Sequence, residues 1–361
     1  MDSSSSSSDD ETIIAFVNRL GQPRKQRVFR NRTDNFLEWD ENEFFNRFRL
    51  TKRCVNIVLD LITFKIQSST DRNHAVTPAQ MILITIRFLA SSGMLITVGD
   101  FAGIHKTTAG KHIWKVLQAI VELKSTFLTF PNDPIVIQNI KKDFYNIAKF
   151  PKVVGALDCT HVKIQSPGGL NAEIYRNRKQ FFSINVQAIC DSNLKFLDVV
   201  SRWQGSAHDS RIFQHSKIYS RFQNREFGDS ILLGDGGYPL KIFCITPLQN
   251  VNTPAENLFN EAQIRTRNPI ERAFGVWKRR FPILSTGIRL NVSKAQCLII
   301  ATAILHNIAT IDKEQHCALP PLPREIEEAI NFVNNVPNNI HINNNNNYLR
   351  NRYVQYFEHL L

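Results

Sequence analysis

The sequence lacks the features of disulfide-stabilised, secreted and membrane-spanning proteins. Its six cysteines lie far apart without a Cys-x-x-Cys pair, which disfavours a zinc knuckle or thioredoxin-like motif and indicates reduced intracellular thiols. The N-terminus is a run of serines and acids rather than a basic, apolar signal peptide. The most apolar stretch, residues 297–311, contains His306 and Asn307 and is too short to span a bilayer. We therefore expect a soluble intracellular protein without a membrane partner.

Acidic residues are in deficit. Asp and Glu number 32 against 44 Lys and Arg, which gives a net charge of +12. Such a surplus favours a polyanionic partner, with nucleic acid ahead of an anionic membrane surface. The chain has 361 residues, of which 43% are apolar and 21% charged, so it has material for about two folded units. This composition excludes a wholly disordered chain.

The sequence divides into four parts by composition. Residues 1–34 begin with serines and acids, continue with scattered arginines, and are expected to form a disordered tail. Residues 35–150 have apolar residues three and four apart and few glycines, which is typical of helices. Residues 151–318 mix strand-like and helical segments, which predicts an α/β layer. Residues 319–361 are an asparagine-rich linker followed by a short helix.

The helical part has the order of a helix-turn-helix. The sequence Thr77-Pro78-Ala79-Gln80 predicts a helix start, and the helix continues to about Ala90. Two further helices are expected at 97–104 and 107–123, joined by a brief turn. Three lysines lie off the apolar stripe of the last helix and could contact DNA phosphates: Lys106, Lys111 and Lys115. An ordinary helical bundle with solvated lysines explains the pattern equally well.

The α/β part is expected to form a mixed sheet. Residues 153–164 are a nearly continuous apolar run, as in a strand buried on both faces. Further strands are predicted at 181–190, 194–203, 231–233 and 243–245, and a helix at 212–222. The remainder to about residue 311 is predicted to be helical.

Three acids stand at unusual positions. Asp158 interrupts the first buried strand, and Asp235 follows the strand at 231–233, where functional crevices lie in open α/β sheets. Glu271 lies early in a helix predicted over Pro269–Phe281, on the same face as Gly275, which would leave room for a substrate. Together, three carboxylates in a basic chain meet the requirement of a two-metal phosphoryl-transfer site with hard oxygen ligands. Soft and imidazole-rich ligand clusters are absent, which disfavours zinc.

Each acid also has an ordinary structural explanation. Asp158 could pair with an arginine, and Asp235 could begin a turn with the glycines after it. Glu271 could complete a capping box that starts at Asn268.

Six motifs, in the same order, resemble those of the PIF/Harbinger transposases and the nucleases derived from them. They are GALDCTHVKI, YRNRKQFFSINVQAICD, WQGSAHDSRIF, LLGDGGYPL, RNPIERAFGVWKRRFPIL and ILHN. The resemblance runs from about Phe36 to Asn307. Two residues depart from the family pattern: Cys159 replaces a glycine, and Gly236, directly after Asp235, replaces a serine. A third residue, Pro269, is expected to start a helix just before Glu271 and so to shift the reach of this acid to the metal.

The resemblance implies a ribonuclease-H-like mixed sheet with flanking helices, preceded by the all-α, helix-turn-helix-like part. It implies a catalytic and metal-binding triad of Asp158, Asp235 and Glu271 that holds Mg²⁺ or Mn²⁺, in a two-ion site. It further implies a location in the nucleus, with the cytoplasm as a second location, and a separate Myb-like protein that supplies sequence-specific DNA binding. Paired transposon ends leave a homo-oligomer open.

Several other residues are candidates for the site. Asp209 is either a fourth metal-site acid or a helix N-cap, with the cap slightly favoured. Five basic residues could hold the DNA backbone or could be solvated: Arg176, Arg178, Lys179, Lys278 and Arg279. His161 is expected to pack or hydrogen-bond in its strand, and His306 to be a core histidine.

The sequence therefore favours a divalent-metal-dependent DNA endonuclease that cleaves phosphodiester bonds by a two-metal mechanism, with strand transfer if it acts as a transposase. A catalytically inactive, domesticated DNA-binding or adaptor protein is the main alternative. A metal phosphohydrolase is less favoured, because Thr160 stands where a second aspartate would be needed.

Overall fold

A computed structural model describes residues 32, 34–70, 74–312 and 347–361 of the chain. The expected disordered tail at residues 1–34 lies almost wholly outside the described residues, as does the linker that begins at residue 319. The described cysteines are free thiols, and Cys317 lies outside the described part.

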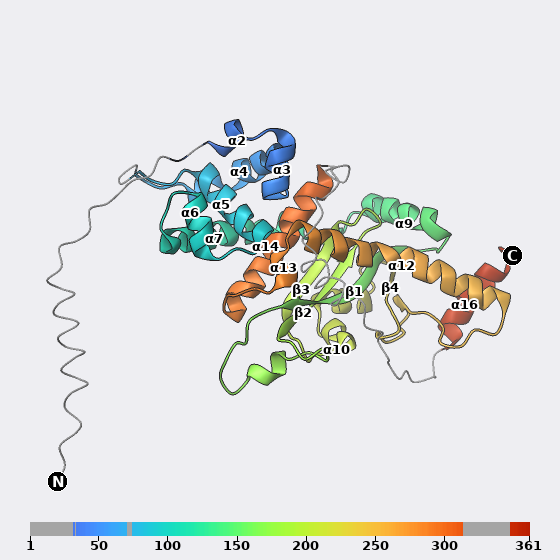
Figure 1. Ribbon diagram of the computed structural model, residues 1–361. Coiled ribbons are helices and arrows are strands. Elements are labelled where there is room, and N and C mark those ends of the chain that lie inside the picture. The colour runs from blue at the N-terminus through green and yellow to red at the C-terminus, as the bar shows by residue number, and fades with distance from the viewer. Residues whose placement is uncertain (1–31, 33, 71–73, 313–346) are drawn as a thin grey trace, which may run out of the picture. The chain divides into compact units, whose positions relative to one another are not determined.

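The first part of the described chain is helical (Figure 1). Its helices are α2 (Asn35–Glu38), α3 (Glu41–Phe48), α4 (Lys52–Ile66), α5 (Pro78–Ser91), α6 (Leu95–Phe101), α7 (Lys106–Val121), α8 (Lys124–Phe127) and α9 (Pro134–Ala148). Helix α5 begins with the capping box predicted at Thr77 and Gln80.

Helices α5, α6 and α7 follow one another in the predicted order. The chain turns tightly between α6 and α7, where a side chain at Gly99 would come within 2.7 Å of the Ile104 carbonyl oxygen. The predicted stripe of Ile113, Leu117 and Ile120 is buried. Helix α7 also packs against α14 (Val292–Ile311), so much of its surface is covered by protein.

The second part is built on a mixed sheet of β1 (Val153–Lys163), β2 (Ser183–Cys190), β3 (Phe196–Gln204), β4 (Ile231–Leu233) and β5 (Cys244–Ile245). The strand order is β3-β2-β1-β4-β5. The pairs β1–β2 and β2–β3 are antiparallel, whereas β1–β4 and β4–β5 are parallel. This is the expected ribonuclease-H-like α/β arrangement, in which the long central strand β1 carries Asp158.

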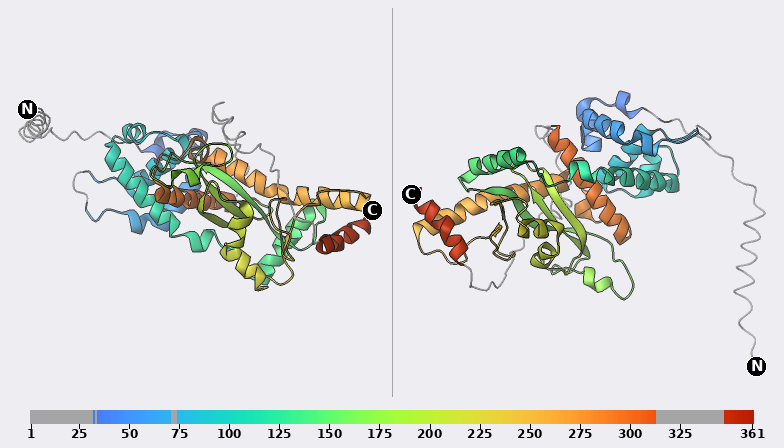
Figure 2. Two further views of the ribbon diagram at one scale, coloured as in Figure 1. Left: turned by 90° about the horizontal axis from the view of Figure 1, so that it is seen from below. Right: turned by 180° about the vertical axis from the view of Figure 1, so that it is seen from behind.

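Helices cover both faces of the sheet (Figures 1 and 2). Helix α12 (Pro254–Arg280) packs on the face of β1 that includes Asp158, and α10 (Asp209–Gln214) contacts β2 from the other face. The single helix predicted at 212–222 is two helices, α10 and α11 (Lys217–Gln223), because the Ser216 side chain caps a new start there. A short 3-10 helix, η1 (Ala172–Tyr175), precedes β2.

The prediction that a helix starts at Pro269 is wrong. Helix α12 starts at Pro254, where Thr253 and Glu256 form a capping box, and runs through Pro269 without a new start. An interior proline costs about 3 kcal/mol. Burial of one continuous face offsets that cost; its members include Phe259, Ala262, Thr266, Ile270, Ala273 and Trp277.

The prediction that the most apolar segment is too short to span a bilayer is also wrong by length. Helix α14 has 20 residues and is long and apolar enough to cross a membrane, but it is mostly buried. It packs on α7 and β3, as a core helix does. The short α13 (Ile283–Thr286) precedes it, and the predicted last helix is α16 (Asn347–Glu358), whose Arg350 donates to the Thr246 carbonyl at 3.0 Å.

Candidate functional site

Strand pairing brings Asp158 and Asp235 together. Strands β1 and β4 are parallel, and Ala156 lies opposite Leu233. Asp158 lies two residues further along β1, and Asp235 lies two residues after Leu233, just beyond the end of β4. Because paired strands run about 4.8 Å apart, the two aspartates lie near each other. The two carboxyls are close enough for Asp235 to raise the pKa of Asp158. Two of the three predicted acids therefore meet at the carboxyl end of β4.

Asp158 lies in an environment that disfavours its charge. Only 16% of its side chain is exposed. Burial, together with the neighbouring Asp235 and Asp209, raises its pKa to about 8, although the Arg267 guanidinium and the Cys159 N–H oppose this. The Cys159 N–H donates to Oδ1 at 2.7 Å. Burial and the neighbouring acids together therefore outweigh the cation beside Asp158.

Arg267 joins Asp158 to the third predicted acid. Its Nη1 lies 3.0 Å from Asp158 Oδ2, and its Nη2 lies 2.5 Å from Glu271 Oε1. Glu271 is one turn further along α12, and 53% of its side chain is exposed. The arginine partner expected in the ordinary explanation of Asp158 is therefore present, whereas the capping-box explanation of Glu271 fails because the helix has no start there.

Asp209 belongs to the same group of acids. It is the first residue of α10, whose cap residue is His208, so the favoured N-cap interpretation is wrong. Its Oδ1 instead accepts from the Asn185 Nδ2 at 2.8 Å. Burial and the nearby Asp235 raise its pKa. Asp209 thus interacts electrostatically with both strand aspartates, which supports the fourth-acid interpretation.

The side-chain chemistry of the four acids suits a hard divalent cation. All four offer carboxylate oxygens, the ligands that Mg²⁺ and Mn²⁺ prefer. Burial and neighbouring acids raise the pKa values of Asp158 and Asp209, and a cation beside them would favour their charged forms. Within the described residues no group of three or more His, Cys, Asp or Glu is already arranged to hold a metal, since Arg267 lies between Asp158 and Glu271.

Lys278 is not placed for the DNA contact predicted for it. It is fully buried, and its Nζ donates to Thr160 Oγ1 at 2.6 Å. Burial lowers its pKa to about 7. A lysine in that position supports strand β1 from α12 and cannot reach a ligand at the surface.

The other predicted basic residues differ in availability. Arg178 is exposed and contacts His208, with Nη2 2.8 Å from Nδ1. Arg176 is engaged locally by Glu173, with Nε 2.7 Å from Oε2, while Lys179 is half-buried. Lys115 donates to the Ile66 carbonyl at 2.7 Å and so caps α4. The exposed candidates also include Lys106, Lys111 and Arg279.

The two histidines have the structural roles expected of them. His161 Nδ1 lies 3.0 Å from Ser183 Oγ, and burial lowers the pKa of His161 to about 4. His306 is fully buried and donates from Nε2 to the Leu194 carbonyl at 2.8 Å.

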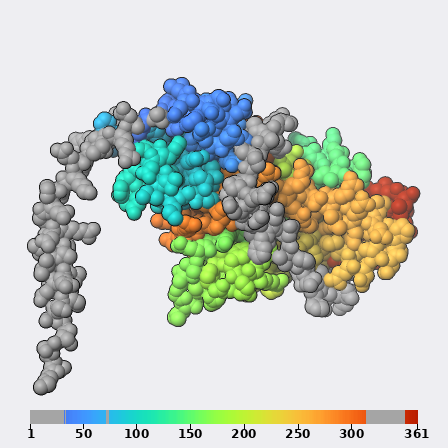
Figure 3. Space-filling model, in the orientation of Figure 1, coloured from blue at the N-terminus to red at the C-terminus, as the bar shows by residue number. Residues whose placement is uncertain are grey.

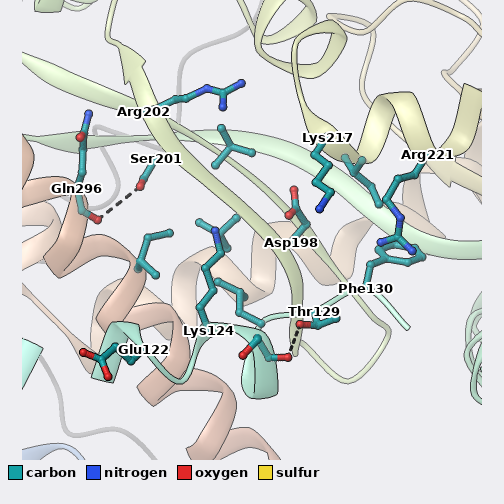
Figure 4. Close-up of a pocket in the computed structure, with 16 residues that line it drawn as sticks. Glu122, Lys124, Thr129, Phe130, Asp198, Ser201, Arg202, Lys217, Arg221 and Gln296 are labelled. Carbon is teal, nitrogen blue, oxygen red and sulfur yellow. Dashed lines mark hydrogen bonds between the residues drawn. The ribbon is translucent and has the colours of Figure 1, made fainter. Parts of the chain in front are cut away.

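A polar cavity lies along the edge strand β3, two strands from β1 (Figure 4). Two acids line this cavity of about 730 Å³: the exposed Glu122 and the half-buried Asp198, whose pKa is raised by burial although the surrounding cations oppose this. The basic residues that line it are Lys124, Arg202, Lys217 and Arg221. We call it the β3-edge cavity.

Sequence reasoning missed Arg267 and Asn185. The spacing of Arg267 and Glu271, four residues apart in a helix, was the available signal for the first. Asn185 had no such signal, since its role depends on strand β2 lying beside α10.

Comparison with known proteins gives a consistent picture. Residues 157–307, which include all four acids, match the family model described as DDE superfamily endonuclease. The chain is 34% identical to "Putative nuclease HARBI1" of Rattus norvegicus and to the human protein of that name, over 72% of this chain and 74% of each relative. It is 23% identical to "Protein ALP1-like" of Arabidopsis thaliana, over 79% of this chain and 75% of that protein. No solved structure matches.

Proposed function

The chain belongs to the Harbinger-derived family of DDE superfamily endonucleases, and from this we propose that it is a divalent-metal-dependent nuclease that hydrolyses phosphodiester bonds in DNA. The observation that carries the proposal is the placement of Asp158 and Asp235 side by side, with Asp209 near both. Like-charged buried acids are costly for a fold unless a cation joins them.

Four acids would hold the metal: Asp158, Asp235 and Glu271, with Asp209 as the additional ligand. When bound there, two Mg²⁺ or Mn²⁺ ions activate the attacking water and neutralise charge on the leaving oxygen. A cation bound there would favour the ionised form of Asp158, whose pKa is about 8 in the free protein. Glu271 is the most exposed of the ionic partners around Arg267 and can turn toward a ligand with the least cost.

The remaining side chains position these acids. Lys278 fixes β1 from α12 through Thr160, and Asn185 orients Asp209. Arg267 holds Asp158 and Glu271 in the metal-free protein, and with a divalent cation on these acids its guanidinium would be available to a phosphate oxygen.

In keeping with this activity we also propose a nuclear location and a separate Myb-like partner that selects the DNA sequence. The basic residues Lys106, Lys111 and Arg178 are proposed to contact DNA phosphates, and a homo-oligomer is proposed to bring two DNA ends together. The net charge of +12 supports a polyanionic substrate.

Cleavage of supercoiled plasmid DNA in Mn²⁺ tests the proposal. Asp158→Asn should abolish cleavage while the far-ultraviolet circular dichroism stays unchanged. Asp198→Asn, in the β3-edge cavity, is the matched control and should retain cleavage. Cleavage that survives Asp158→Asn, or that proceeds in EDTA, contradicts the assignment.

The same assay, run beside hydrolysis of a small phosphate ester, separates the alternative functions. An inactive DNA-binding or adaptor protein would bind the plasmid without cutting it in either metal. A metal phosphohydrolase would hydrolyse a small phosphate ester such as p-nitrophenyl phosphate and leave DNA intact.

A further inference from the structure

Three arginines share one exposed side of α12. Arg265, Arg272 and Arg279 are seven residues apart, so they lie within about 40° of one another around the helix. All three are exposed. Seven residues advance about 10.5 Å along the helix, close to the axial rise of three nucleotides in one strand of B-DNA.

The stripe is only partly neutralised by acids. Arg265 pairs with Glu261 at 3.2 Å, one turn before it. Arg272 has no hydrogen-bond or ion-pair partner among the described residues, and it borders a cavity of about 450 Å³ together with Arg265 and the single acid Asp143. Arg272 therefore gains most from an added phosphate, because no existing ion pair of its own has to be broken.

The stripe continues into a group of arginines in the helical part. Arg280, next to Arg279, donates to the Arg49 carbonyl at 3.2 Å, which brings the end of α12 to the end of α3. Burial, Arg279 and Arg87 all lower the pKa of Arg49. Like charges gathered in this way repel one another, and an added polyanion would relieve that repulsion.

A glycine separates the stripe from the acids. Around the helix axis Gly275 lies between Glu271 and the arginines, at about 40° from each of Glu271 and Arg279. A side chain added at Gly275 would meet nothing within 4 Å, so packing within the described protein does not require a glycine there. An interior helical glycine costs stability relative to alanine, which leaves close approach of a ligand as the physical reason for it.

We propose that Arg265, Arg272 and Arg279, continued by Arg49 and Arg87, form an arginine track that holds the backbone of duplex DNA across Gly275 and beside Glu271. This inference rests on the nuclease function proposed above. Part of α12, coloured gold to orange, is exposed on the face drawn in Figure 3. The β3-edge cavity is also basic, but it is a hollow that contains Asp198, and it lies at the sheet edge two strands from β1.

Binding of a fluorescein-labelled 30-base-pair duplex of arbitrary sequence, in EDTA so that no cleavage occurs, tests the track by fluorescence anisotropy. The triple variant Arg265→Gln, Arg272→Gln, Arg279→Gln should bind at least about 10-fold more weakly at 0.1 M KCl. Its slope of log affinity against log salt should fall by about 2 to 3, since each phosphate contact contributes about 0.9.

The β3-edge cavity supplies a charge-matched control. The triple variant Lys124→Gln, Arg202→Gln, Lys217→Gln removes the same three charges from exposed residues and should bind within about 2-fold of the wild type. Equal losses in the two triple variants would mean that net charge alone acts, and would overturn the track while leaving the nuclease proposal intact. A wild type that fails to bind the duplex even at low salt would contradict both.

Gly275→Ala tests the path of the backbone with two readouts of opposite sign. Alanine should raise the melting temperature by about 1–3 °C, because it is the better helix former and its added methyl group meets nothing within 4 Å. The same substitution should weaken duplex binding several-fold, because the added methyl group would stand where the DNA backbone passes. A variant that is stabilised and binds DNA as the wild type does overturns the passage across Gly275.

Discussion

Two polar sites lie at the sheet, and their charges are opposite in balance. In the β1–β4 site three aspartates lie within each other's electric field, with Arg267 as the cation bound to Asp158. In the β3-edge cavity four basic side chains and one exposed acid, Glu122, surround the half-buried Asp198. Burial raises the pKa of the acid in both places, but neighbouring carboxylates raise it further only in the first. A buried aspartate therefore indicates a cation site only where other acids surround it.

Among substitutions that test this difference between the two sites, removal of Arg267 should have the largest effect on the free energy of unfolding. Arg267→Gln leaves Asp158 buried without its cation and should cost about 2 kcal/mol of unfolding free energy in EDTA, less than the full loss of a buried pair because Asp158 can take up a proton. Urea unfolding measures this cost. Saturating Mn²⁺ should recover more stability in the variant than in the wild type.

Arg265→Gln is the control on the same helix. Its ion pair with Glu261 is exposed on both sides and should contribute less than about 0.5 kcal/mol. Equal costs for the two substitutions would show that Arg267 does not neutralise a buried charge.

Replacement of Asp158 should have an intermediate effect of opposite sign. Its folded pKa, about 8, lies above its usual value of 3.8, so its contribution to stability is fully present below about pH 4 and is lost as the pH rises through about 8. Asp158→Asn should therefore stabilise the metal-free protein, relative to the wild type, more at pH 8 than at pH 5. Melting temperatures in EDTA at both pH values measure this, and a variant whose melting temperature changes with pH as the wild type's does would contradict the assigned pKa.

Replacement of Asp229, an acid outside both polar sites, should have the smallest effect on stability. Lys141 and Lys152 lower its pKa to about 2, so its contribution is present above about pH 4 and is lost as the pH falls through about 2. The Asp229 side chain is 59% exposed, so Asp229→Asn should cost less than about 1 kcal/mol at pH 7. Unfolding in urea at pH 7 and pH 2.5 measures the difference, and a larger cost at pH 2.5 would refute the pairing.

Much of the fold could be predicted from sequence because local signals and packing agree. The apolar run at 153–164 is β1, and the capping residues Thr77 and Gln80 start α5. Prediction failed where tertiary packing outweighs a local signal. Pro269 is a strong local start signal, yet the buried face of α12 continues through it.

The site was predictable in its acids and less so in its cations. Asp158 within β1 and Asp235 just after β4 could be singled out in advance because both stand at buried strands, whereas their proximity depends on the parallel pairing of β1 with β4. Lys278 was misjudged because a lysine in a helix ordinarily points to solvent, whereas here a space between α12 and β1 takes it in beside Thr160. Whether one long side chain is buried depends on how the helix packs across the strand, and the sequence does not specify that packing.

The central claim is that the aspartates of β1 and β4 form one divalent-cation site. Titration of the purified protein with Mn²⁺, followed by the loss of the free-ion electron paramagnetic resonance signal, tests it directly, with wild type beside Asp235→Asn and with duplex DNA present. We predict saturable binding by the wild type that Asp235→Asn removes. Equal binding by both proteins, or none by either, would contradict the claim.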